Sequence, residues 1–220
     1  MIILFDFDGV IADTESQYTI FWNKKGKEYL GLDNFGLMIK GQTFKQIAAG
    51  PFKDNLHELY EEIEPELNEF ERTMSYDYVP GALEFMQSLK AAGIKTAIVT
   101  SSHNVKMASA YRAHPELLEV VDRILTSNDF SKSKPDPECF LKGMEVLGGT
   151  PEETIIFEDS LHGIAAGRAA GAKVIGLTTT NKSEALTPLC DMVINDFTSI
   201  DADMLSKLLH KPQTQQVPQG

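Results

Sequence analysis

Two aspartates separated by a single phenylalanine are the first residues in this sequence that could carry chemistry. Asp6 and Asp8 follow a short apolar run, Ile2–Phe5, and Gly9 comes next. Side chains alternate between the two faces of a strand, so both carboxylates would point the same way if the strand stayed regular. Carboxylates held this close repel each other, and their charges are costly unless a cation or a shared proton compensates. The pair therefore indicates a site that takes positive charge from elsewhere.

Three other polar groups stand at the borders of predicted strands and helices. Thr100-Ser101-Ser102 follows the apolar run Ile94–Val99, Lys134 precedes a predicted helix, and Glu158-Asp159 closes the run Ile155–Phe157. Open α/β sheets bind their ligands at the C-terminal ends of the strands. Carboxylates for a hard cation, a hydroxyl and an ammonium together suit phosphoryl transfer, with Mg²⁺ as the cation.

Each group in such a site has a task. The cation would remove the repulsion between Asp6, Asp159 and an incoming phosphate. One carboxylate would then attack phosphorus and form an aspartyl-phosphate, while Lys134 and Thr100 hold the phosphoryl oxygens. A second carboxylate, two residues from the nucleophile, would protonate the leaving oxygen and later deprotonate water.

Buried strands and amphipathic helices alternate along most of the chain, which predicts an α/β fold with a Rossmann-like, mainly parallel sheet. A capping-box spacing at 150–153 and an N-cap at Asp136 with Pro137 at the first helical position mark helix starts. The predicted strands are Ile2–Phe5, Ile94–Val99, Ile155–Phe157 and Val174–Leu177, and the predicted helices are Ala82–Ala92, Pro137–Leu147 and Leu161–Ala170.

Residues 15–78 break this alternation and predict an inserted α-helical domain. Its apolar residues Leu56, Leu59, Ile63, Leu67 and Phe70 step by helical intervals, and Pro65 should kink or divide that helix. The glutamates between them are interpreted as a solvated helix surface. We expect a core of residues 1–14 plus 79–210, the helical insert of residues 15–78, and a disordered polar tail of residues 211–220.

Composition excludes several classes of protein. The net charge is −12 with no block of Lys or Arg, which argues against nucleic-acid binding. No apolar stretch approaches the length of a membrane span. Cys139 and Cys190 stand in no metal-like spacing and are interpreted as reduced thiols. We expect a cytoplasmic protein, monomeric, acting on a small molecule.

Four motifs in order resemble those of the haloacid dehalogenase (HAD) superfamily: DFDGV at 6–10, VTSS at 99–102, Lys134-Pro135 and Glu158-Asp159. The insert between the first two motifs resembles the helical cap of the C1 class, which includes β-phosphoglucomutase and related phosphatases. The resemblance implies that Asp6 is the nucleophile and that Asp8 is the general acid/base, whose backbone carbonyl also binds the metal. Its further assignments are metal binding by Asp6, Asp159 and Glu158, and substrate binding by Thr100, Ser101, Lys134 and the insert residue Lys40.

Other residues near the motifs have both a functional and a structural interpretation. Glu158 is either a metal ligand or a partner for Lys134. Asp13-Thr14 resembles the hinge into the cap, yet either residue also suits a helix N-cap. His162 is interpreted as a helix-start residue and not as a second base. Small residues allow close helix–sheet packing without a chemical role, namely Gly163, Ala166, Gly167 and Ala170.

Asp8 decides between chemistries of the superfamily, because the dehalogenases and phosphonate-cleaving enzymes lack an acid at that position. The expected function is a Mg²⁺-dependent phosphatase of a small phosphorylated metabolite, such as a sugar phosphate. The alternative is a sugar-phosphate mutase, and a less favoured one is an inactive fold that only binds. The mutase has a histidine where this chain has Tyr18, and a phosphate-gripping arginine where it has Phe44.

Overall fold

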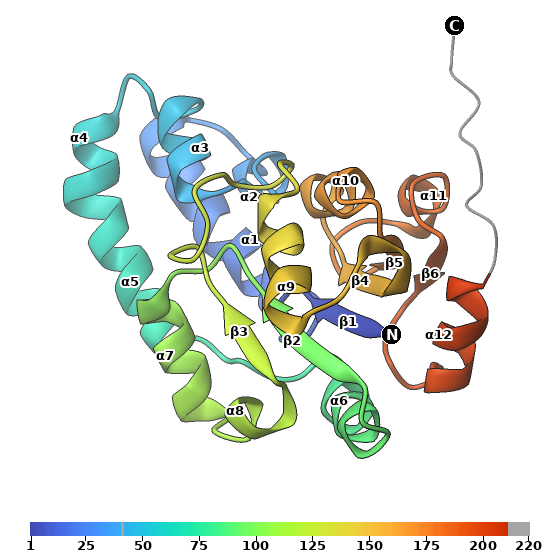
Figure 1. Cartoon of the computed structure of the whole chain (residues 1–220). Coiled ribbons are helices and arrows are strands. Elements are labelled where there is room, and N and C mark those ends of the chain that lie inside the picture. Colours follow the sequence, from blue (N-terminus) through green and yellow to red (C-terminus); the bar gives the residue numbers. More distant parts are fainter. Residues whose placement is uncertain (41, 211–220) are drawn as a thin grey trace, which may run out of the picture.

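A parallel sheet of six strands runs through the centre of the protein (Figure 1). The structure is a computed structural model that describes residues 1–40 and 42–210. The strand order is β3-β2-β1-β4-β5-β6, and every neighbouring pair is parallel. The strands are β1 (Ile2–Phe5), β2 (Lys95–Val99), β3 (Arg123–Leu125), β4 (Thr154–Glu158), β5 (Lys173–Leu177) and β6 (Met192–Ile194).

The four predicted strands are confirmed, with small shifts at their ends. Two more, β3 and β6, escaped prediction because each has only three residues and lies at an edge of the sheet. Strand β1 lies between β2 and β4, and its four residues are buried. Its uninterrupted apolar sequence therefore reflects burial on both faces, as parallel sheets require. The predicted tail, residues 211–220, lies outside the described residues.

Helices cover both faces of the sheet. Phe85 of α6 and Met107 of α7 pack on one face, and Phe140 of α9 and Ala166 of α10 pack on the other. The helices of the core are α6 (Ala82–Ala91), α7 (Asn104–Ala113), α8 (Leu117–Val120), α9 (Glu138–Leu147), the 3₁₀ turn η3 (Pro151–Glu153), α10 (Leu161–Ala169), α11 (Ser183–Leu186) and α12 (Ala202–Leu209).

The predicted helices of the core are confirmed, but two of their starts differ from prediction. Pro137, not Asp136, takes the N-cap position of α9, and the Asp136 carboxylate accepts a 3.0 Å hydrogen bond from the Glu138 amide instead. Thr150 precedes a 3₁₀ turn as expected, but its side chain makes no capping hydrogen bond.

The inserted helical domain has its own apolar core around Trp22, Phe35 and Phe52. The predicted stripe is buried or half-buried except at Leu56, which is 43% exposed because it opens its helix at the outer end. Pro65 lies in the first turn of α5, where the chain changes from π-helical to α-helical turns. The elements are α1 (Glu15–Lys25), η1 (Gly26–Leu30), α2 (Phe35–Met38), α3 (Phe44–Ala49), α4 (Leu56–Glu58), η2 (Leu59–Ile63) and α5 (Glu64–Thr73).

The insert joins the core through two segments that run side by side in opposite directions. The Val79 amide donates to the Ile11 carbonyl at 2.9 Å, and the Asp13 amide donates to the Asp77 carbonyl at 2.8 Å. The insert also reaches the core at its far side, where α5 packs against α7 (Figure 1). The insert thus lies over the C-terminal edge of the sheet. Within the described residues no helix combines the length and apolar character needed to cross a bilayer.

Candidate active site

A cavity of about 410 Å³ lies between the helical insert and the C-terminal edge of the sheet. The fold brings to its floor the side chains that follow β1, β2 and β4, because parallel strands end at a common edge. The residues of the core that line the cavity are Asp6, Asp8, Thr100, Ser101, Ser102, His103, Lys106, Lys134, Glu158 and Ser160. All the candidate core residues except Asp159 are among them.

Lys134 joins two of these carboxylates. Its Nζ lies 2.7 Å from Asp6 Oδ1 and 2.7 Å from Glu158 Oε1, and all three side chains are buried. Burial opposes the charge of the ammonium, but Asp6 and Glu158 outweigh it and raise the pKa of Lys134. Lys134 is therefore a fixed cation at the end of β1. Lys132, by contrast, is exposed and pairs with Asp136 at 3.2 Å.

Asp6, Glu158 and Asp159 form a buried cluster in which one oxygen of each lies within 4.8 Å of the others. Burial, opposed by Lys134, raises the pKa of Asp6 to about 7. Burial, reinforced by Glu158, raises the pKa of Asp159 well above its ordinary value. One ammonium serves three buried carboxylates and contacts two of them, so full ionisation of the cluster would leave negative charge that its neighbours do not neutralise. Oxygen ligands with excess negative charge fit Mg²⁺.

Glu158 has both carboxylate oxygens engaged by protein groups. Oε1 pairs with Lys134, and Oε2 accepts hydrogen bonds of 2.9 Å from the amides of Asp159 and Ser160. Gly163 of α10 makes room for this carboxylate, because a Cβ there would lie 1.6 Å from Glu158 Oε1. The role of Gly163 therefore differs from the predicted helix–sheet packing: the missing side chain leaves the space that the Glu158 carboxylate occupies.

Asp159 is held by the loop after β5, which sequence reasoning missed. The Thr180 hydroxyl donates to Asp159 Oδ2, and the Asn181 amide nitrogen donates to the Asp159 carbonyl at 2.8 Å. Gly9 adopts a φ of +70°, and a Cβ on it would lie 2.1 Å from Asp159 Oδ2. The glycine of the DFDG motif therefore lets the turn after β1 approach the carboxylate.

Asp8 lies in a different environment from Asp6. Its Oδ1 accepts hydrogen bonds of 2.5 Å from the Lys106 ammonium and the Thr14 hydroxyl, and its Oδ2 accepts one of 2.8 Å from Ser102. Burial opposes ionisation, yet Lys106 and these donors hold the pKa of Asp8 below its ordinary value. Thr14 is the N-cap residue of α1 but uses its hydroxyl on Asp8 instead of on the helix.

Lys106 is the main functional candidate that the sequence did not reveal. It is 4% exposed, and its ammonium lies 4.6 Å from the centre of the Tyr18 ring. The one available signal in the sequence was its position in the first turn of α7. This helix has His103 as its N-cap and follows directly after the Thr100-Ser101-Ser102 motif. From sequence alone, a lysine on a helix is expected to be exposed to solvent unless the helix is known to face the site.

The phosphate-binding candidates of the core lie where predicted. Thr100 is 1% exposed, and its Oγ1 accepts a 3.0 Å hydrogen bond from the Ser102 amide, which leaves the hydroxyl proton for another acceptor. Ser101 is half-buried and lines the cavity. His162 does not line the cavity, in agreement with its interpretation as a helix-start residue.

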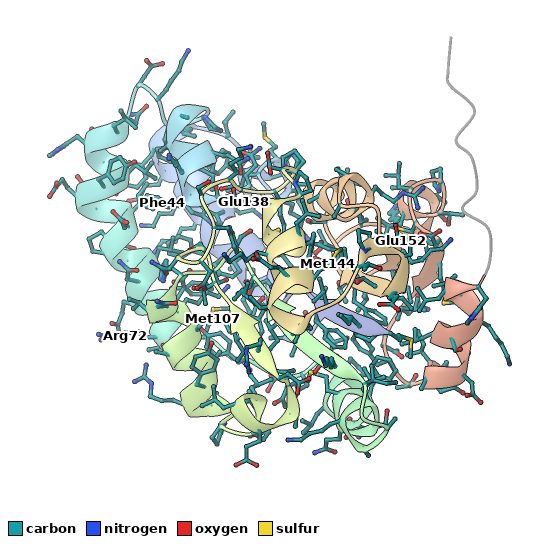
Figure 2. All side chains as sticks on the ribbon, in the orientation of Figure 1. Phe44, Arg72, Met107, Glu138, Met144 and Glu152 are labelled. Carbon is teal, nitrogen blue, oxygen red and sulfur yellow. The ribbon has the colours of Figure 1, made fainter. Side chains whose placement is uncertain are left out.

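The insert supplies the roof of the cavity. Lys40 lines it and lies 3.9 Å from Glu15, and Phe44 of α3 (Figure 2) lines it near Lys45. The Tyr18 hydroxyl donates to Glu71 Oε1 at 2.8 Å. The interpretation of the insert glutamates as a solvated surface is wrong for Glu64, which is half-buried and lines the cavity, while Glu61, Glu62, Glu66 and Glu69 are exposed. Glu71, which follows that segment, is buried and also lines the cavity.

Comparisons with known proteins agree on one family. The family model described as haloacid dehalogenase-like hydrolase matches residues 3–177. The bifunctional riboflavin kinase/FMN phosphatase of Arabidopsis thaliana is 31% identical over 202 residues, which are 90% of this chain and 52% of that protein. Glycerol-1-phosphate phosphohydrolase 1 of Saccharomyces cerevisiae is 31% identical over 212 residues, covering 90% of this chain and 82% of the yeast protein.

Two further comparisons concern the mutase and the fold. A β-phosphoglucomutase of Mycobacterium bovis is 26% identical over 235 residues, with 90% of each chain covered. The crystal structure of a HAD hydrolase of family IA, variant 3, from Entamoeba histolytica superposes with a TM-score of 0.83. It covers 95% of this chain and 99% of its own, at 24% sequence identity. The predicted fold, a Rossmann-like sheet with an inserted helical domain, is confirmed.

Proposed function

Because the chain belongs to the haloacid dehalogenase-like hydrolase family, we propose that it is a Mg²⁺-dependent phosphatase that hydrolyses a small phosphorylated metabolite. The observation that carries the proposal is the buried Lys134 ammonium between Asp6 and Glu158, with Asp159 alongside. Relatives that are 31% identical carry phosphatase names, one for FMN and one for glycerol 1-phosphate.

Asp6 is the nucleophile of the proposed reaction. Its carboxylate oxygen attacks phosphorus, the bond to the leaving alcohol breaks, and an aspartyl-phosphate forms. Lys134 supports this role because it already lies 2.7 Å from the Asp6 carboxylate and is in place to balance charge on the phosphoryl oxygens. Thr100 and Ser101 line the same floor and bind those oxygens with their hydroxyls.

Asp8 serves as general acid and then as general base. It gives a proton to the leaving oxygen, and in the second step it takes one from the water that attacks the aspartyl-phosphate. The pairing with Lys106 favours the ionised form, which is the form needed for the second step. Water attack completes the cycle, releases phosphate and regenerates Asp6.

Asp6 and Asp159, together with the backbone carbonyl of Asp8, would hold Mg²⁺. When bound, the cation supplies the charge that lets a phosphate dianion approach the carboxylates. We assign Glu158 to positioning Lys134 and the turn at Asp159, because its two oxygens already accept from Lys134 and from two backbone amides.

The helical insert is the proposed cap, covering residues 15–78 over a core of residues 1–14 and 79–210. The paired segments around Ile11 and Val79 would be its hinge, and its opening would admit water and release the product. Lys40 is the proposed insert residue for substrate binding, since it lines the cavity. The proposal includes a cytoplasmic protein that works as a monomer, and two cysteines outside any disulfide fit a reducing compartment.

The mutase remains the alternative because of the Mycobacterium bovis relative. A mutase must hold a second phosphate after the first is transferred, which favours a cation on the cap. In this chain Phe44 stands at the position of the mutase arginine and packs its ring 5.7 Å from the Tyr60 ring. Tyr18 stands at the position of the mutase histidine and donates to Glu71. These two contacts favour hydrolysis. A binding protein without catalysis is disfavoured by the complete carboxylate and lysine set.

A panel of phosphomonoesters with Mg²⁺, assayed for released phosphate, tests the proposal. Conversion of β-glucose 1-phosphate to glucose 6-phosphate is assayed in parallel. We expect phosphate from several esters without isomer formation, and Asp6→Asn should lower kcat by on the order of 10³-fold or more. Asp54→Asn, an exposed aspartate of the insert, is the matched control. Undiminished hydrolysis by Asp6→Asn would refute the mechanism.

A further inference from the structure

Three polar residues of α5 share the helix face that lines the cavity. Glu64, Asn68 and Glu71 are spaced by four and three residues, which places them on one side of an α-helix. Leu67 lies beside them and also lines the cavity. The face is therefore part of the cavity lining that the insert contributes.

Glu71 is a buried carboxylate with hydrogen-bonding capacity to spare. Its side chain is 8% exposed, Tyr18 donates to Oε1, and Oε2 has no hydrogen-bond partner in the described residues. His103 Nε2 lies 3.5 Å from this oxygen. His103 Nδ1 accepts from the Lys106 amide at 3.1 Å, which leaves Nε2 as the ring nitrogen that faces Glu71.

Glu64 and Asn68 are half-buried, and neither side chain makes a hydrogen bond or ion pair within residues 1–40 and 42–210. Both are thus free to bind a ligand. A carboxylate accepts hydrogen bonds from hydroxyls, while the amide both donates and accepts. Such a pair matches an alcohol with further hydroxyl groups.

The charged residues of the roof also bear on which substrates the cavity accepts. The insert lines the cavity with three carboxylates and two lysines, and no arginine of the described residues lines it. Lys40 lies 3.9 Å from Glu15, so part of its charge is already compensated. Lys45 is exposed at the rim. A second anionic group on the substrate would therefore meet the carboxylates of Glu64 and Glu71 on the roof, with the exposed Lys45 as the lysine that is not already paired.

We propose that the α5 face of Glu64, Asn68 and Glu71 selects phosphomonoesters of uncharged polyols and rejects those with a second anionic group. The proposal rests on the proposed phosphatase function and specifies its substrate class. The apolar walls, formed by side chains such as Trp22 and Ile39, would contact the carbon skeleton, and the α5 face would bind its hydroxyls.

Two matched substrate pairs test the proposal, each differing by a hydroxymethyl or a carboxylate group. They are racemic glycerol 1-phosphate with 3-phosphoglycerate, and sorbitol 6-phosphate with 6-phosphogluconate. We expect kcat/KM to be at least tenfold higher for the hydroxymethyl member of at least one pair. Glu64→Gln should narrow this ratio several-fold, and Glu64→Lys should narrow it further by raising activity on the carboxylate member.

Glu61→Gln is the control, since it removes the same charge from an exposed position just before α5. It should leave the ratio unchanged. Equal or faster turnover of both carboxylate members, a ratio insensitive to Glu64→Lys, or activity confined to esters other than the hydroxymethyl members would overturn the proposal. Absence of phosphate release from every ester, p-nitrophenyl phosphate included, would instead overturn the phosphatase function itself.

Discussion

Replacing Lys106 by methionine should weaken the second step of the reaction more than the first. The substitution keeps most of the side-chain volume beside the Tyr18 ring but removes the ammonium 2.5 Å from Asp8 Oδ1. Asp8 would keep its hydrogen bonds from Thr14 and Ser102. Because Lys106 holds the pKa of Asp8 below its ordinary value, that pKa should rise in the variant.

The magnitude follows from the contact. Lys106 is 4% exposed and the Asp8 side chain 17%, so solvent screens the pair only weakly. A hydrogen bond to a charged partner contributes roughly 1.5–3 kcal/mol. That range corresponds to a change of about tenfold to somewhat more than a hundredfold in the preference of Asp8 for its ionised form. A larger fraction of Asp8 would be protonated and ready to give a proton to the leaving group, and a smaller fraction would be ionised and ready to take a proton from water.

Stopped-flow measurement of p-nitrophenol release from p-nitrophenyl phosphate separates the two steps. In Lys106→Met we expect a burst of p-nitrophenol followed by slow turnover. In the pH profile of kcat, the acid limb should be displaced to higher pH. Lys106→Arg should restore much of the wild-type profile, and Lys142→Met, at an exposed position on α9, should behave as wild type. A variant with a folded circular dichroism spectrum, no burst and an unmoved acid limb would refute the assigned role of Lys106.

Two further predictions concern the acidic cluster. Gly163→Ala should lower kcat/KM at least about tenfold with little loss of helix content, because the new Cβ would lie 1.6 Å from Glu158 Oε1 and displace that carboxylate from Lys134. Ala165→Gly, at an exposed position of the same helix, is the control. An unchanged kcat/KM in Gly163→Ala would contradict the reasoning. Mg²⁺ should raise the melting temperature more at about pH 8 than at about pH 5.5. Burial raises the pKa of Asp6 to about 7, so without metal the stability from this group falls as pH rises from about 4 to 7, and protons compete with the cation below about pH 7. Thermal denaturation with and without Mg²⁺ measures this, and equal shifts at the two pH values would contradict it.

Local sequence patterns predicted most of the sheet and the floor of the site. The strands β1, β2, β4 and β5 have continuous apolar runs because both faces are buried, and the polar residues that end them mark the functional edge. The edge strands β3 and β6 gave no such signal, since each has only three residues and Leu125 alone among the six is buried. Strands could be predicted where burial on both faces requires a continuous apolar run in the sequence.

The residues that escaped prediction depend on how distant elements pack. Lys106 and Glu64 have the sequence context of solvated helix residues, and only the placement of α7 and α5 against the cavity distinguishes them. Gly163 looked like a packing residue because the Glu158 carboxylate that needs its space comes from the end of β4. A helical pattern identifies the apolar face of a helix, but it does not say which of the polar residues face a cavity.

The two aspartates of the DFD motif are separated by one residue and yet face opposite electrostatic conditions. Asp6 is buried beside Glu158 and Asp159 and shares a single ammonium with Glu158, so its ionised form is costly without a further cation. Asp8 has an ammonium of its own and two hydroxyl donors, so its ionised form is stable without metal. Groups whose environments drive their pKa values apart take different roles in catalysis. One of the donors to Asp8 is Thr14, at the start of the first helix of the insert, and therefore a movement of the insert would act directly on Asp8, the proposed proton-transfer residue, while leaving Asp6, the proposed nucleophile, in place.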